Sequence, residues 1–325
     1  MRGCFLLGLS LALACQEPST AGDEGGDDGS TGLPSPYADS GDESGQDQPA
    51  LVMEQVVASG VGGLQTFIAL QPDALVAAYT GIAVLEEGCP EEWESFDEGE
   101  TTTTVWYSEA GCTTSEGVEF RGGGRLVVES RLEGETMIDA TTLSSEGGTL
   151  RVSNGDTFFQ MTGYVAISRA AGPEVTEAGF ELGGEFSADP GTADGSPLMD
   201  GSLTAQGFIY SFSDGTNNAI GGSGSLSGEG LADARAFSFS DVLVILGQCA
   251  TEPIGTLSVR DDVGFWHDIV FDAGSFDPQS DDEPIYDAES CDGCGAYLAG
   301  GERLGDACVS VADVESLLDW ENAPW

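Results

Sequence analysis

The sequence predicts a mainly β fold: a large antiparallel meander that forms a curved sheet or a partly closed barrel, with a short apolar N-terminal helical segment and a C-terminal helix. Three observations predict it. Apolar and polar residues alternate through much of residues 101–272, as in half-buried strands. Glycine-containing turn signals, among them Asn154-Gly155, separate these runs at short intervals. Apolar residues at helical spacing stand before and after this region.

Residues 1–14 have the features of an export signal. Arg2 precedes a mostly apolar run from Cys4 to Ala14, which is too short to cross a hydrocarbon core. Small residues lead into Cys15. The segment resembles the signal of a bacterial lipoprotein precursor, although Ala12 stands where leucine is commoner. The resemblance covers only about the first fifteen residues.

This resemblance implies that Cys15 becomes the first mature residue and carries a lipid. Gln16 at the next position implies sorting to the outer membrane, on its periplasmic or its surface face. The alternative is simple secretion after the same cut, with Cys15 in a disulfide. The partners that we expect are therefore the membrane, through the lipid, and an extracellular ligand of unspecified chemistry.

Residues 15–49 predict a disordered acidic tether. The segment is rich in Asp, Glu, Gly, Ser and Pro and contains no basic residue. Such a composition cannot bury enough apolar surface to offset the entropy lost on ordering, and its like charges extend it. We expect the tether to hold the body, residues 50–325, away from a membrane surface.

The body is expected to be a single β-rich unit that begins with an apolar segment, residues 50–88. Leu51, Val52, Gln55 and Val56 stand at helical spacing. The glycines at 60–63 and Pro72 interrupt the pattern, which predicts two short helices, or a helix and a strand, packed against the sheet.

Residues 89–275 predict about ten to twelve strands. In one run Leu126, Val128 and Leu132 share a face opposite the charged residues between them. The same alternation places Phe159, Met161, Val165 and Ile167 on one face of a second run, and Phe237 and Phe239 on one face of a third.

A cysteine-containing segment, residues 276–325, completes the body. Its end predicts a helix with Ser310 as N-cap and Val311, Val314, Leu317 and Leu318 on one face. An outer-membrane β-barrel is the alternative architecture, since the strand count, the many glycines and the final Trp325 are typical of barrels. The predicted helix argues against it.

The charge balance excludes several function classes. The chain has 57 acidic and nine basic residues, all of the latter arginine, for a formal net charge of −48. Binding to nucleic acid or to anionic lipid headgroups is therefore not expected. Without lysine there is no Schiff-base, Walker-type or Ser-Lys chemistry. So much charge also predicts a protein that works in saline surroundings or with bound divalent cations.

Six cysteines remain in the body if Cys15 carries lipid, and an even number in an exported protein predicts three disulfides. They are Cys89, Cys112, Cys249, Cys291, Cys294 and Cys308. Cys89–Cys112 is the natural local pair, and the other four are expected to staple the C-terminal segment to the strand that ends near Cys249. Zinc binding or redox chemistry at Cys291-Asp-Gly-Cys294 remains an alternative.

No catalytic set is assembled in the sequence. His267 is the only histidine, and alternation places it with Ile269 and Phe271 as a partly buried structural residue in a strand. No Gly-x-Ser-x-Gly elbow is present. Calcium could be held by the acidic tether or by Asp189, Asp194 and Asp200, although an acidic solvated loop is the favoured interpretation.

We therefore expect a non-enzymatic binding or scaffold module without a cofactor. The alternative is an envelope hydrolase that acts on polysaccharide through paired carboxylates. A groove that combines two close carboxylates with Trp93, Trp106 or Trp266 would favour the hydrolase.

Overall fold

The computed structural model of the chain describes residues 49–173, 175–189, 201–213, 218–228, 231, 234–245, 248–249, 252–275, 285–286 and 291–309. The predicted signal, Cys15, the tether to residue 48, most of the 189–200 loop and the predicted C-terminal helix lie outside these residues.

Two helices open the described part of the chain. α1 (Met53–Ile68) buries Val56, Leu64 and Phe67, and α2 (Pro72–Ile82) begins at a proline, whose fixed φ suits a first helical position. The prediction that Gly60, Gly62 and Gly63 would interrupt the first segment is wrong, because α1 includes all three glycines. Its packing explains this: a β-carbon at Gly63 would lie 2.4 Å from the Phe237 ring. Tertiary contact thus outweighs the low helix propensity of glycine.

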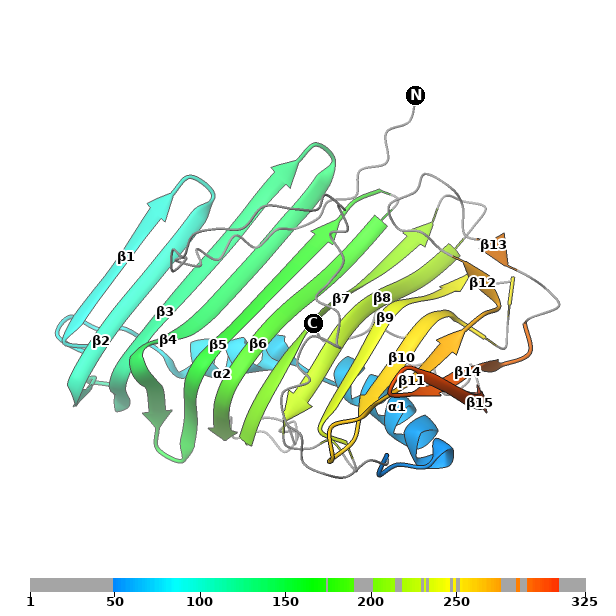
Figure 1. The fold of residues 1–325 in the computed structure, drawn as a ribbon. Helices are drawn as coiled ribbons and strands as arrows, with labels where there is room; N and C mark the ends of the chain where they lie inside the picture. The colour runs from blue at the N-terminus through cyan, green and yellow to red at the C-terminus, as the bar shows by residue number, and fades with distance from the viewer. Residues whose placement is uncertain are drawn as a thin grey trace, which may run out of the picture.

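Thirteen strands form one antiparallel sheet whose order follows the chain, as predicted (Figure 1). They are β1 (Glu92–Glu98), β2 (Thr101–Thr113), β3 (Val118–Glu133), β4 (Thr136–Asn154), β5 (Thr157–Ala171), β6 (Val175–Asp189), β7 (Gly201–Ser213), β8 (Asn218–Gly228), β9 (Ala236–Ile245), β10 (Ile254–Arg260), β11 (Trp266–Phe271), β14 (Cys294–Ala299) and β15 (Glu302–Cys308). β12 (Gly274–Ser275) and β13 (Ile285–Tyr286) form a separate pair. The large sheet is not closed into a barrel. Of the two predicted forms, a sheet and a partly closed barrel, the described strands therefore form the sheet.

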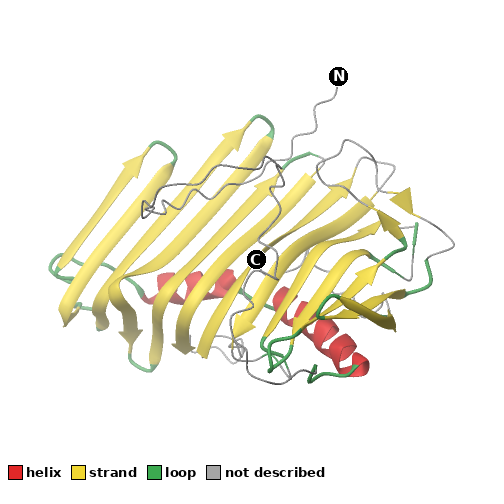
Figure 2. Ribbon diagram, in the orientation of Figure 1, coloured by secondary structure: helices red, strands yellow, loops and turns green. Residues whose placement is uncertain are grey.

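The two faces of the sheet differ. Both helices lie on one face, which we call the inner face, and the opposite one is the outer face (Figure 2). On β5, alternation holds as predicted: Phe159, Met161 and Val165 are buried on the inner face, while the residues between them point outward. In the described part of the chain, no helix packs on the outer face.

The helices cover only part of the inner face. α2 lies across β4–β6, and α1 across β8–β10 (Figure 1). Leu126, Val128 and Leu132 share the inner face as predicted, but Val128 is 41% and Leu132 63% exposed. These residues lie toward the end of β3 that extends beyond α2. The sheet is therefore exposed on both faces at this corner.

Phe67 joins α1 to the centre of the sheet. Its ring centroid lies 5.0 Å from that of Phe180 and 4.9 Å from that of Phe239. β-carbons at Gly207 and Gly224 would each lie 2.7 Å from the Phe67 ring, so these two glycines leave the space that the ring fills. A second link, 2.8 Å long, runs from Trp106 Nε1 on β2 to the Tyr79 hydroxyl on α2.

The described residues form three disulfides. Cys89–Cys112 is the predicted local pair and fastens the segment before β1 to β2. Cys249–Cys291 joins the C-terminal segment to the residues after β9, as expected, whereas Cys294–Cys308 lies within the C-terminal hairpin β14–β15. Cys291 and Cys294 thus belong to different disulfides rather than to a redox pair or a zinc site. None of the described helices is long and apolar enough to cross a membrane.

Candidate functional site

His267 lies on the inner face of β11 in a sealed polar network. Its Nε2 is 3.1 Å from Asp261 Oδ2, and its Nδ1 is 2.9 Å from the Tyr297 hydroxyl. The side chains of His267 and Asp261 are both 0% exposed. A base needs contact with its substrate, so this arrangement supports the structural role predicted for His267, with complete rather than partial burial.

Asp261 also fixes the point where the chain enters the body. Its carboxylate accepts hydrogen bonds from the backbone N–H groups of Ala50 at 2.9 Å, Phe265 at 2.7 Å and Val263 at 3.1 Å. Burial raises the Asp261 pKa, but the hydrogen bonds from Ala50, His267 and Phe265 outweigh burial, so the pKa lies below its usual value. The ionised carboxylate thus holds the start of α1 to the end of β10.

A second buried carboxylate, Glu252, organises the C-terminal hairpin. It is 0% exposed and accepts backbone N–H bonds from Asp272 and Ala273 on one oxygen, and from Asp292 and Gly293 on the other, at 2.9–3.3 Å. Four donors offset the cost of removing this charge from water. Glu252 therefore positions the two segments that flank the Cys249–Cys291 bridge.

The outer face carries a group of titratable residues around Tyr210, on β7. Glu177 of β6 is directly opposite Tyr210 in the sheet, and Tyr210 lies over Gly221 of β8, where a β-carbon would be 2.8 Å from its hydroxyl. Burial raises the Tyr210 pKa to about 12, with further contributions from the negative charges of Asp241 and Glu177. Burial also raises the Glu177 pKa.

Asp241, a third member of this group, has an unusual backbone conformation. It is the one described residue other than glycine with a positive φ, 51°, and it lies at a bulge between β8 and β9. Its N–H donates to Ser223 Oγ at 2.8 Å. Sparsely populated backbone conformations concentrate at functional sites, so Asp241, Glu177 and Tyr210 form the candidate catalytic group of this face.

A second tyrosine–carboxylate pair lies two strands away. The Tyr164 hydroxyl donates to Glu181, and the Tyr164 pKa is raised to about 12, chiefly by burial and then by Glu181. Between the two tyrosines, Phe208 is 38% exposed and its ring stacks near Tyr210 at 6.3 Å. The centre of the outer face therefore combines exposed aromatic surface with hydrogen-bonding groups.

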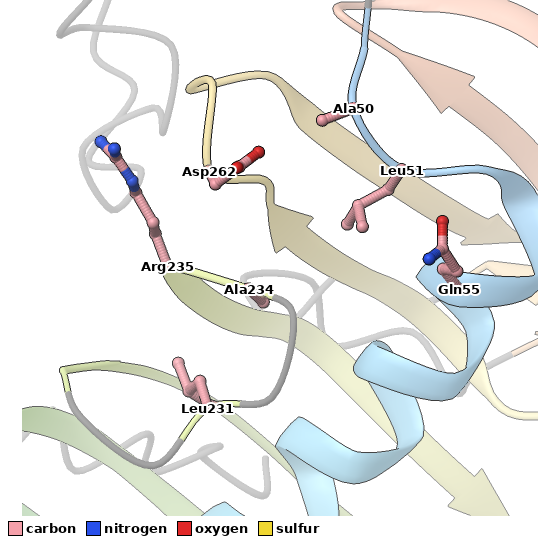
Figure 3. A pocket seen from close by; sticks show the side chains of 7 residues that line it. All are labelled: Ala50, Leu51, Gln55, Leu231, Ala234, Arg235 and Asp262. Carbon is pink, nitrogen blue, oxygen red and sulfur yellow. The ribbon is translucent and has the colours of Figure 1, made fainter.

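An open depression of about 380 Å³ lies beside the start of α1 (Figure 3). Two of its lining residues are charged, Arg235 and Asp262, and they come from the segments flanking β9 and β10. The other lining residues are Ala50, Leu51, Gln55, Leu231 and Ala234. It marks the point at which the tether joins the body.

The structure does not bring the three predicted tryptophans together. Trp93 of β1 is directly opposite the buried Trp106 of β2, so these two are neighbours on the inner face, whereas Trp266 is far along the sheet on β11. Of the three predicted calcium ligands, Asp194 and Asp200 lie outside the described residues, as does the side chain of Asp189. No group of three or more His, Cys, Asp or Glu residues in the described part could hold a metal ion.

Sequence reasoning did not single out Glu177, Tyr210 and Asp241. Alternation within each strand assigns Glu177 and Tyr210 to the polar face, but only the register of four strands places them together.

The fold thus defines an open, disulfide-linked antiparallel sheet with helices on one face. Neither family models nor curated proteins nor solved structures show a match to this chain.

Proposed function

We propose that this chain is an exported protein, anchored by lipid on Cys15, whose body acts as a binding or scaffold module through its outer face. The observation that carries the proposal is one-sided helix packing: α1 and α2 pack on part of the inner face, whereas no described helix packs on the outer face, where aromatic side chains are exposed. Tyr107 is 40%, Phe96 38% and Phe208 38% exposed. Aromatic side chains are enriched at binding surfaces, where they contribute much of the binding energy.

The anchor is tested by labelling. The precursor is expressed in a Gram-negative host that is fed an alkyne-tagged fatty acid. We expect the label on the wild type and on the matched control Cys4→Ser, because Cys4 leaves with the signal, and none on Cys15→Ser. An unlabelled wild type would contradict the anchor.

The binding surface is tested on an array of bacterial envelope polysaccharides and peptidoglycan fragments. We expect the purified body to bind, and Phe208→Ser to weaken binding at least about tenfold, since one exposed aromatic contributes on the order of 1.5 kcal/mol. Val84→Ser is the matched control, because Val84 is 50% exposed in the loop after α2. The absence of binding, or equal losses in the two variants, would contradict the proposal.

A polysaccharide hydrolase is the second candidate, favoured by two carboxylates, Glu177 and Asp241, that both act on the Tyr210 hydroxyl from different strands. Glu177, with its raised pKa, suits a general acid, and Asp241 supplies the second carboxyl group. Release of reducing sugar from one of the arrayed polysaccharides, lost in Glu177→Gln, would establish this activity. Release that is unchanged in Glu177→Gln would exclude this site.

A further inference from the structure

The arginines are unevenly distributed over this acidic protein. Eight remain after the signal, and four of them stand on the outer face of β3 and β4: Arg121, Arg125, Arg131 and Arg151. Two adjacent strands out of thirteen thus hold half of the positive charge. On a chain with 57 acidic residues, such a concentration is not explained by general surface composition.

Three of these four arginines have no acidic partner among the described residues. Arg131, Arg169 and Arg303 each lie within 4.0 Å of a carboxylate, whereas no described carboxylate lies that close to Arg121, Arg125 or Arg151. Arg235 and Arg260 are also without such a partner in the described residues, but they lie apart, beside β9 and at the end of β10. We call Arg121, Arg125 and Arg151 the arginine patch.

The patch includes a like-charge pair. Arg121 and Arg151 are directly opposite each other in the β3–β4 ladder, an arrangement with β-carbons about 5 Å apart in which like charges destabilise a sheet. The fold therefore gains nothing from this pair, which points to a ligand that neutralises it.

Neighbouring groups hold Arg151 in place. Its Nη1 donates to Gln160 Oε1 on β5 at 2.9 Å, and its guanidinium carbon lies 5.2 Å from the Phe158 ring centroid. Arg121 is exposed on β3, and its side chain lies beside Gly111 of β2. A β-carbon at Gly111 would lie 3.7 Å from Arg121 Nε. The Arg151 guanidinium is thus held in one orientation, whereas the exposed Arg121 guanidinium can move to contact a ligand.

The surroundings of the patch indicate what that ligand is. Guanidinium groups bind planar carboxylates through two parallel hydrogen bonds. Beside Arg151, the exposed hydroxyls of Thr149 and Thr162 are 3.1 Å apart. The 40% exposed Tyr107 ring lies against Gly123, where a β-carbon would be 3.0 Å from the ring. Hydroxyls and an exposed ring suit the hydroxyls and the apolar face of a sugar.

The charge around the patch limits the ligand to one anionic group. Glu119 stands two residues before Arg121 on the same face, and Glu185 is directly opposite Thr162. These carboxylates and the net charge of −48 would repel a polyanion with an acid on every residue. A single carboxylate within an otherwise neutral saccharide meets less repulsion, which the two guanidinium groups can offset.

We propose that Arg121 and Arg151 bind the sugar carboxylate of an acidic saccharide on the outer face, with the Tyr107 ring and the hydroxyls of Thr149 and Thr162 contacting the sugar. This inference rests on the proposed use of the outer face for binding and names a ligand class for it.

The test is calorimetric titration of the purified mature body, without lipid, with a glucose–glucuronic acid disaccharide. The neutral glucose disaccharide and sodium acetate are the comparison probes. We expect the acidic disaccharide to bind at least about tenfold more tightly than either, because only it supplies both the carboxylate and the sugar ring. The double variant R121Q/R151Q should lose at least about tenfold in affinity.

Arg235→Gln is the matched control, since Arg235 is also exposed and without a carboxylate partner among the described residues. It should bind like the wild type. Removal of the facing charges should leave the melting temperature of R121Q/R151Q unchanged or higher, which separates lost binding from lost folding.

Three results would overturn the inference: no binding of the acidic disaccharide, equal binding of the neutral one, or full affinity in R121Q/R151Q. Acetate binding as tight as that of the disaccharide would also overturn it, since the site would then hold any small anion. The array experiment with Phe208→Ser tests the proposed binding role separately. If a neutral ligand binds at the centre of the outer face and the acidic disaccharide does not bind, the binding role stands and only the present inference fails.

Discussion

The ring of Phe67 occupies the place that a side chain at Gly224 would fill. A β-carbon at Gly224 would lie 2.7 Å from the Phe67 ring and 2.8 Å from the ring of Phe239. This contact fixes how closely α1 approaches β8, and with it the position of the helix over the centre of the sheet.

Gly224→Ala is therefore expected to destabilise the body by about 1–3 kcal/mol, because the two rings must move out of a closely packed core. The measurement is the free energy of unfolding in urea. Gly62→Ala is the matched control: it lies within α1, a β-carbon there would have no heavy atom within 4 Å, and the change should stabilise by about 0.5–1 kcal/mol. A neutral Gly224→Ala would show that α1 does not depend on this contact.

Asp261→Asn is expected to destabilise the protein at neutral pH by about 3 kcal/mol, since it weakens a buried, multiply hydrogen-bonded carboxylate beside His267. The Asp261 pKa is lowered by folding, so its contribution is present above the unfolded value of about 4 and is lost as the pH falls through the lower folded value. The difference in unfolding free energy between wild type and variant should therefore shrink below about pH 4. A difference that stays constant down to pH 2 would exclude the ionised carboxylate as its source.

Glu252→Gln tests the second buried carboxylate. The variant should lose about 2–3 kcal/mol, because the side-chain NH₂ of glutamine cannot accept the N–H bonds that the carboxylate oxygen accepts. Glu302→Gln, at the exposed start of β15, is the control and should change stability by less than about 0.5 kcal/mol. Faster hydrogen exchange of the Ala273 and Gly293 amides would locate the effect, and unchanged exchange would contradict the assignment.

The net charge predicts a strong dependence on salt. The melting temperature should rise by several degrees between about 10 mM and 1 M NaCl, as the Debye length falls from about 30 Å to 3 Å and self-repulsion is screened. An uncharged osmolyte at matched osmolality controls for non-ionic effects. An unchanged melting temperature would mean that the described ion pairs and buried networks already offset the repulsion.

Much of this fold was predictable from local pattern. The period-two runs and the glycine turns identified an antiparallel meander, and the alternation of Phe159, Met161 and Val165 identified the buried face of β5. These features depend on the geometry of a single strand and its turns, which neighbouring residues determine. The path of α1 through Gly63 was not predictable, because its cause is Phe237, 174 residues away in the chain.

The candidate sites divide in the same way. The amino-acid sequence alone establishes the scarcity of positive charge, the six cysteines of the body, the single histidine and the alternation that predicts the polar faces of the strands. Which of these residues meet depends on the tertiary structure. Arg121 faces Arg151, Glu177 faces Tyr210, and His267 meets the Tyr297 hydroxyl because strand register brings together positions 30 or more residues apart in the chain. Register depends on the summed packing of a whole face, so no local pattern contains it.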